Sequence, residues 1–201
     1  MNKTAVVAWG RANPPTVGHE KLFDKTIEHA KQVNGDSHIY VSHSQDTRKN
    51  PLSSSEKVNL IKKSYRNTKN LHVNSSSKES PSILHIASKL HKEGYQHLHL
   101  VAGSDRVEQY HKLLHDYNGK EGPHGSYNFK SIKVISAGHR DPDSEGAEGM
   151  SGSKLRSHAI AGNKEEFKKG MMSGLSDKDK EDVYNKVRST LKENLDNLTL
   201  L

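Results

Sequence analysis

The sequence predicts an α/β fold with a doubly wound, five-stranded parallel sheet and a helical C-terminal extension. Short apolar runs alternate five times with segments of helical periodicity, which is typical of parallel strands joined by crossover helices. The first run, residues 4–9, is almost uninterrupted, as expected of a strand buried on both faces. Beyond Gly162 the pattern becomes entirely helical.

The first half of the chain supplies three strand-and-helix pairs. Strands are expected at 4–9, 38–42 and 71–73. The helix after the first strand ends at Asn34–Gly35, and a polar, basic loop at 46–51 follows the second strand. Ser53 and Glu56 have the spacing of a capping box, so a helix should begin there. The next helix is expected to have Ser80 as its cap residue and Pro81 at its first helical position.

The second half completes the sheet. A fourth strand at 97–101 leads into Gly103, Asp105 and a helix to about Tyr117. A Gly-rich loop at 118–126 precedes a fifth strand at 131–136, and an acidic loop at 141–148 precedes another helix. With right-handed crossovers this is a Rossmann-like fold. A strand order of 3-2-1-4-5 would place strands one and four at the switch point where ligands bind. No G-x-G-x-x-G follows the first strand, which argues against an NAD-binding domain.

We expect a Rossmann-like domain at 1–162 and a helical extension at 163–201. Asn163 and Glu166 mark a short helix, and Ser176 should cap a charged helix from 177 to about 194. The apolar stripe of that last helix consists of Val183, Tyr184, Val187 and Leu191. For the apolar end at 198–201 the sequence leaves packing, docking and fraying open.

The net charge and the aromatic content indicate what kind of ligand the protein binds. The 201 residues carry a formal charge of +7, which favours an anionic ligand such as a nucleotide, a phosphorylated substrate or a nucleic acid. Aromatic residues make up only 5%, so stacking platforms for nucleic acid are scarce and this partner is not expected. The fourteen histidines are scattered with no His-Glu-x-x-His, so no metal site is expected.

The same sequence carries no sign of a membrane or secreted protein. It has no apolar stretch near the roughly 20 residues of a membrane span, and the start lacks a secretory pattern. It contains no cysteine, which is consistent with a reducing compartment. We therefore expect a soluble, cytoplasmic protein.

The junction after the first strand is the strongest local signal. Residues 9–20 contain Pro14 and Pro15, which cannot continue a strand, and Gly10 and Gly18, which permit close backbone approach. His19 falls in the first turn of the following helix, where unpaired backbone N–H groups favour an anion. A phosphate-binding turn is predicted here.

Three segments are similar to one known family. Thr16-Val17-Gly18-His19 resembles the T/H-x-G-H signature of the nucleotidyltransferase superfamily, which includes pantetheine-phosphate and nicotinamide-mononucleotide adenylyltransferases and small cytidylyltransferases. Ser151-Gly152-Ser153-Lys154-Leu155-Arg156 resembles its S-x-[ST]-x-x-R segment, and Gly103-Ser104-Asp105 resembles its G-x-D step. The resemblance covers about residues 4–162.

The resemblance implies attack by a phosphate oxygen of an acceptor on the α-phosphorus of a nucleoside triphosphate, with release of pyrophosphate. Mg²⁺ is then expected as a cofactor carried mainly by the triphosphate. The expected catalytic residues are His19, Thr16 and Arg156. The expected nucleotide-binding residues are Gly10, Arg11, Gly18, Gly103, Asp105, Ser151, Gly152 and Ser153. Arg48 and Lys49 are candidate contacts to an anionic acceptor, although Arg11, Arg48 and Lys49 fit a solvated surface equally well.

Departures from the family pattern leave the substrate open. The usual aromatic-Asp-Pro is replaced by Ala12-Asn13-Pro14, so an acidic group is missing there. Arg156 and the Gly103-to-Asp105 step favour transfer of AMP from ATP to an acceptor such as nicotinamide mononucleotide. A cytidylyltransferase and a non-catalytic nucleotide-binding fold used in assembly remain alternatives, and a homo-oligomer is compatible with the sequence.

Overall fold

The computed structural model describes residues 3–139 and 149–199, so the predicted acidic loop at 141–148 and the last two residues lie outside the described part. The chain forms two compact units that are interleaved in sequence. The first, here the sheet unit, contains Met1–Gly10, Lys21–Ser42 and Thr68–Arg140. The second, here the helical unit, contains Arg11–Glu20, His43–Asn67 and Asp141–Leu201.

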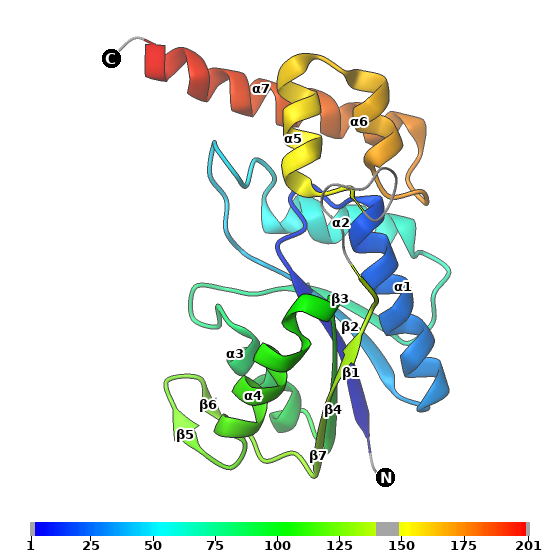
Figure 1. Cartoon of the computed structure of the whole chain (residues 1–201), viewed down its shortest axis with the longest axis vertical. Helices are drawn as coiled ribbons and strands as arrows, with labels where there is room; N and C mark the ends of the chain where they lie inside the picture. The colour runs from blue at the N-terminus through cyan, green and yellow to red at the C-terminus, as the bar shows by residue number, and fades with distance from the viewer. Residues whose placement is uncertain (1–2, 140–148, 200–201) are drawn as a thin grey trace. The chain divides into compact units, whose positions relative to one another are not determined.

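The sheet unit is built on five parallel strands (Figure 1). These are β1 (Thr4–Gly10), β2 (Asp36–Val41), β3 (Leu71–Ser75), β4 (His97–Ala102) and β7 (Ser131–Ser136). Their order is β3-β2-β1-β4-β7, with Val7 of β1 paired to His38 on one side and Leu100 on the other. This is the 3-2-1-4-5 order that would place strands one and four at the switch point, and the apolar run of β1 is central because residues 5–8 have no exposed surface.

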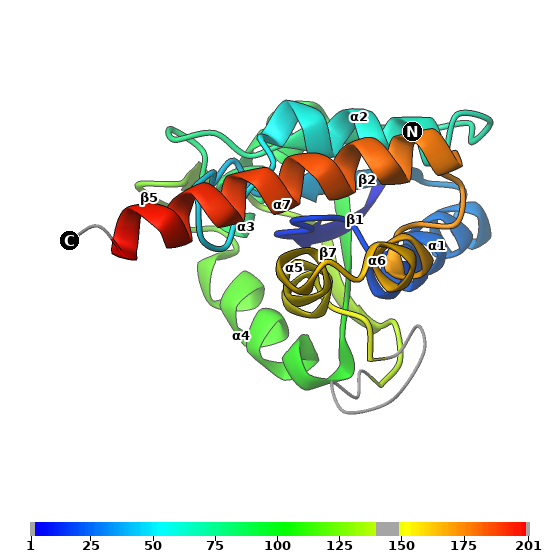
Figure 2. The same cartoon turned by 90° about the horizontal axis from the view of Figure 1, so that it is seen from above.

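Helices cover both faces of this sheet, as a doubly wound fold requires (Figure 2). On one face α1 (Val17–Gln32) packs through Ala30 against Val6 and Val101. On the other face α3 (Ile83–Lys92) and α4 (Val107–Tyr117) pack over alternate residues of the same strands. Strand side chains alternate between the two faces, so β1, β4 and β7 each contribute to both cores.

The start of α3 differs from the sequence prediction. The helix begins at Ile83 with Ser82 as its N-cap, so the start expected at Ser80 is wrong by two residues. The backbone N–H of Ser80 donates to both the carbonyl and the hydroxyl of Ser77, at 3.2 and 3.1 Å. The carbonyl of Ser80, which would accept the first bond of a helix capped by this residue, instead accepts the N–H of Ser77 at 3.3 Å.

The predicted loop at 118–126 contains a small hairpin that the sequence did not reveal. Its strands are β5 (Glu121–Gly122) and β6 (Gly125–Ser126), which precede the buried Tyr127. The Tyr127 hydroxyl donates to the carbonyl of Leu114 at 2.8 Å. A short 3₁₀ turn, η1 (Ser104–Arg106), joins β4 to α4.

The helical unit contains α2 (Ser54–Ser64), α5 (Gly152–Ala161), α6 (Lys164–Gly170) and α7 (Asp177–Thr199). Both bonds of the capping box between Ser53 and Glu56 are present at the start of α2. The last three helices pack together (Figure 1). The rings of Phe167 and Tyr184 meet edge to face between them, with centroids 5.4 Å apart. Arg188 of α7 donates to the carbonyls of Ala159 and Ile160 at the end of α5.

Two further expectations concern the helices. The apolar stripe of α7 is confirmed, because Val183, Tyr184, Val187 and Leu191 are all buried. Within 3–139 and 149–199, every helix is either too short or too polar to cross a membrane.

His29 of α1, which is half-buried, pairs with the buried His99 of β4. The Nε2 atom of His29 lies 2.9 Å from Nδ1 of His99, and His99 is 6% exposed. Burial lowers the pKa of His99 to about 4, with smaller contributions from His29, Lys133 and His97. Burial also lowers the pKa of His29.

We predict that this pair destabilises the protein in acid. The unfolded imidazole binds a proton near pH 6.5 and the folded His99 only near pH 4, so the unfolded state binds more protons between these values. The free energy of unfolding should fall by up to about 1.4 kcal/mol per pH unit as the pH drops through this window. Urea unfolding from pH 7 to pH 4.5 measures the slope.

His99→Gln should reduce this slope because glutamine does not titrate. His115→Gln, at an exposed position of α4, is the control and should leave the slope unchanged. Equal slopes for His99→Gln and the unchanged protein would contradict the assignment.

Candidate functional site

The helical unit contains both of the longer motifs, in the segments 11–20 and 150–156. In the first segment Thr16 is fully buried and precedes α1. Its hydroxyl accepts the backbone N–H of His19 at 3.2 Å, and its own N–H donates to Nδ1 of His19 at 3.1 Å. This reciprocal pair has the form of a capping box in which histidine replaces the usual Glu or Gln. The T-x-G-H spacing thus has a local structural cause.

The same bonds fix the tautomer of His19. Since Nδ1 accepts the N–H of Thr16, that nitrogen carries no proton in the neutral ring. The proton of the neutral ring is therefore on Nε2, which makes Nε2 a hydrogen-bond donor. The Thr16 hydroxyl also lies 2.9 Å from Nδ1 and donates to the carbonyl of Met150 at 3.4 Å, so it joins the two motif segments.

Asn13 holds the first segment to the loop before α2. It is 1% exposed, and its side-chain amide donates to the carbonyl of Leu52 at 2.9 Å and accepts the N–H of Leu52 at 3.0 Å. The carbonyl of Asn13 accepts a bond from Nη1 of Arg156 at 2.8 Å. Asn13 is therefore a structural link among three segments.

The second segment begins α5 and presents Arg156 to the first. Ser151 is the N-cap, and its hydroxyl accepts the N–H of Lys154 at 3.2 Å. Ser153 accepts Nη2 of Arg156 at 3.0 Å. A Cβ at Gly152 would lie 3.0 Å from the carbonyl oxygen of Asn13, so glycine allows the two backbones to approach.

Cations gather around these two segments. The amine of Lys57, a fully buried residue of α2, donates to the carbonyl of Arg11 at 2.8 Å. Burial, and then the charge of Arg11, lower the pKa of Lys57 to about 8. Burial and Arg11 also lower the pKa of Arg156, whereas Asp46 raises it. Burial is the larger cause of both shifts, and the smaller contribution of Arg11 is a repulsion between like charges that a nearby anion would relieve.

Asp46 is near enough to raise the pKa of Arg156 but forms no salt bridge with it. Salt bridges within the described residues do not include Arg11 or Arg156. Glu20, the carboxylate in the first turn of α1, accepts both the N–H and the hydroxyl of Ser173, at 2.9 and 2.5 Å. The geometry can therefore receive an anion without first displacing a salt bridge from Arg156.

The basic loop after β2 is ordered by Asp46. One oxygen of its carboxylate accepts the backbone N–H groups of Arg48, Lys49 and Asn50, at 2.8, 2.6 and 3.2 Å. These bonds, that of Lys49 above all, hold the pKa of Asp46 well below its ordinary range. Arg48 and Lys49 are exposed, so their side chains are available to solvent on an ordered backbone.

The remaining predicted site residues lie in other places. Gly10 ends β1 in the sheet unit, and its carbonyl accepts the N–H of Ser42 at 3.0 Å. Gly18 lies in the first turn of α1. Gly103 is the N-cap of η1 in the sheet unit, and Asp105 is exposed within η1. The segments around His19 and Arg156 thus belong to the helical unit, whereas the G-x-D step belongs to the sheet unit.

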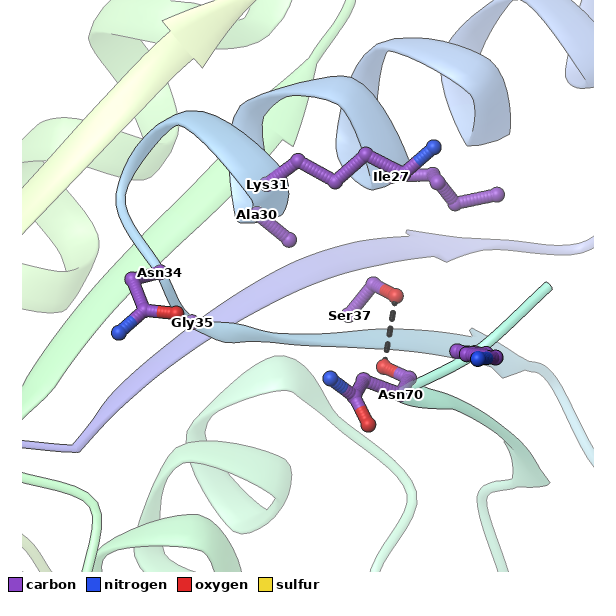
Figure 3. Close-up of a pocket in the computed structure, with 8 residues that line it drawn as sticks. Ile27, Ala30, Lys31, Asn34, Gly35, Ser37 and Asn70 are labelled. Atoms are coloured by element: carbon purple, nitrogen blue, oxygen red, sulfur yellow. Dashed lines mark hydrogen bonds between the residues drawn. The ribbon is translucent and has the colours of Figure 1, made fainter.

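A pocket of about 210 Å³ lies in the sheet unit, between the end of α1 and the starts of β2 and β3 (Figure 3). The hydroxyl of Ser37 donates to the carbonyl of Asn70 beside it at 2.9 Å. Ligand pockets usually enclose roughly 300–1,000 Å³, so this one is small for a nucleotide. None of the predicted site residues lines it.

Sequence reasoning missed Lys57 and the role of Asn13. Lys57 lies on the same helical face as the buried Leu60 and Ile61, and a lysine on an apolar face was the signal that could have found it. Asn13 gave no such signal, because its partner Leu52 is 39 residues away.

Comparison of the chain with models of known protein families and with curated proteins finds no match.

We predict that Asn13→Ala strongly destabilises the protein. The substitution leaves the buried N–H and carbonyl of Leu52 without their partner, which should lower the free energy of unfolding by about 2–4 kcal/mol. Urea unfolding monitored by circular dichroism measures this loss. Asn67→Ala, at an exposed position of the helical unit, is the control and should change the value by less than about 0.5 kcal/mol. An equal effect of the two substitutions would contradict the role of Asn13.

Proposed function

We propose that this protein is a nucleotidyltransferase in which the segments 11–20 and 150–156 hold the triphosphate of a nucleoside triphosphate. The main support is the hydrogen bond from Arg156 to the carbonyl of Asn13, which brings the second motif onto the first. Arg156 donates to a carbonyl and a hydroxyl, and neither acceptor is charged. Its positive charge is therefore not neutralised by these bonds and can attract an anion. Arg11 and Lys57 add further positive charge to the same loop.

In this proposal the acceptor's phosphate oxygen attacks the α-phosphorus, the bond from that phosphorus to the bridging oxygen breaks, and pyrophosphate leaves. His19 donates from Nε2 to an oxygen of the α-phosphate or to the bridging oxygen, with Thr16 fixing the ring through Nδ1. Arg156, Ser151 and Ser153 bind the β- and γ-phosphates. The protein thus aligns the reactants and stabilises charge that spreads over the phosphates.

The proposal also specifies the nucleotide, the acceptor and the metal ion. We assign ATP as the nucleotide, a phosphorylated small molecule such as nicotinamide mononucleotide as the acceptor, and Mg²⁺ as an ion that the triphosphate brings with it. Arg48 and Lys49 are the proposed contacts to the acceptor's phosphate, supported by the ordered backbone that Asp46 gives them. CTP in place of ATP would make the protein a cytidylyltransferase.

Replacement of His19 should remove most of the activity. With Mg²⁺, ATP and nicotinamide mononucleotide, the protein should release pyrophosphate, and His19→Ala should lower kcat about 10²–10³-fold because a donor to the transition state is lost. A coupled phosphate assay after pyrophosphatase measures the release. His158→Ala, on α5 of the same unit, is the control and should keep the rate.

A second variant separates catalysis from folding. His19→Gln retains a side chain that can close the capping box with Thr16, so it should unfold at the same urea concentration as the unchanged protein. Its turnover should remain at least about tenfold below normal, because the imidazole donor is gone. Full activity of His19→Gln would contradict the proposed role. Tight ATP binding without turnover on any phosphorylated acceptor would instead support a non-catalytic nucleotide-binding protein.

Arg156 should control affinity for the triphosphate. Arg156→Gln should raise the Kd for a non-hydrolysable ATP analogue about 10–100-fold, the value of one or two charge-assisted hydrogen bonds. Arg156→Lys should recover only part of this affinity, because an ammonium cannot bond Asn13, Ser153 and a phosphate with one planar fork. Calorimetric titration measures the Kd. Arg66→Gln, an exposed position of the same unit with the same charge change, should have little effect. Equal losses for Arg66→Gln and Arg156→Gln would indicate a general charge effect and contradict the site.

A further inference from the structure

Three metal-ligating side chains meet on two neighbouring strands of the sheet unit. Asp36 and His38 alternate along β2, so they point to the same face, and His72 is paired to His38 in the register of the edge strand β3. One ligand atom from each residue lies within 4.8 Å of the other two. His72 lies more than thirty positions from Asp36 and His38 in the sequence, and none of the three is used in the proposed reaction.

His38 is the buried member of this cluster. It is 3% exposed, its ring stacks on His72 with centroids 4.7 Å apart, and Tyr95 packs edge-on against it at 5.1 Å. Its Nε2 is buried and has no hydrogen-bond partner among the described residues. A buried imidazole is disfavoured as a cation, so it presents a neutral nitrogen. A neutral imidazole nitrogen without a partner is a suitable ligand for a metal ion.

The carboxylate of Asp36 is held by a second residue. The hydroxyl of the buried Tyr95 donates to Oδ2 of Asp36 at 2.7 Å. Outer partners of this kind orient the ligands of a metal and are a regular part of built metal sites. Lys3 lies over the ring of Tyr95 and Lys89 over that of Tyr40, so two positive charges near the cluster oppose a dication and limit its affinity.

The chemistry of the ligands selects the kind of metal. Two imidazoles and one carboxylate suit Zn²⁺ and related transition metals, whereas Ca²⁺ and Mg²⁺ prefer oxygen ligands alone. His72 is exposed, so an ion can enter from solvent and its ring can turn towards the ion. Three protein ligands leave a fourth tetrahedral position to water.

We propose that Asp36, His38 and His72 form a binding site for a transition-metal dication of the Zn²⁺ class. The site ties edge strand β3 to β2 through side chains. The site is separate from any Mg²⁺ that accompanies a triphosphate. The proposal of this site therefore does not depend on the proposed transferase activity.

Zinc binding to the full chain tests this proposal. After treatment with a chelator, the protein is titrated with Zn²⁺ against a chromophoric competitor that reports the Kd. The stacked exposed pair His111 and His115 on α4 is a second place where a cation can bind, so the titrations use the double variant His111→Gln/His115→Gln as the reference. This reference should bind one Zn²⁺, and Co²⁺ in its place should give the visible absorption of a tetrahedral site.

Two variants identify the ligands. His72→Gln changes an exposed side chain, and Asp36→Asn retains an oxygen for the Tyr95 hydroxyl, so both should fold normally by circular dichroism. Each should weaken Zn²⁺ binding at least tenfold and abolish the rise in Tm that Zn²⁺ gives the reference protein. Unchanged Kd in both variants, or loss of all binding in the reference itself, would overturn the proposal.

Discussion

The side-chain amide of Asn13 is the constraint on which the arrangement of the helical unit depends. One buried amide satisfies both backbone groups of Leu52, and the carbonyl of the same residue receives Arg156. An amide can do this because it carries a donor and an acceptor, whereas a carboxylate has only acceptors when ionised. A neutral amide at this position therefore joins three segments of the helical unit.

The two motifs are organised by bonds that also restrict their chemistry. Thr16 and His19 cap α1 with each other's side chains, and this leaves the ring proton on Nε2. Arg156 is fixed by Asn13 and Ser153, beside Arg11 and with Lys57 beneath the same loop. Groups that are already oriented need little reorganisation when charge develops on a ligand, which is the condition for electrostatic catalysis. An anion is the partner this arrangement favours, and the proposed triphosphate satisfies it.

Much of the fold could be predicted from local sequence patterns. Apolar runs predicted the five strands, and the capping box at Ser53 and the stripe of α7 were predicted from spacing alone. The start of α3 was not, because Ser80 forms a turn with Ser77 that competes with helix initiation. The hairpin at 121–126 was also missed, because strands of two residues are too short to show a periodic pattern.

The sequence by itself determined the fold class, because that follows from periodicity and from residue types a few positions apart, and it predicts two segments suited to phosphate. Only the tertiary structure decided that Lys57 is buried beneath Arg11, that Asn13 binds Leu52, and that His38 and His72 stand side by side on neighbouring strands. Those relations join residues 34 to 46 positions apart. No local pattern encodes them, because they arise when strand register and loop closure bring distant backbone into contact.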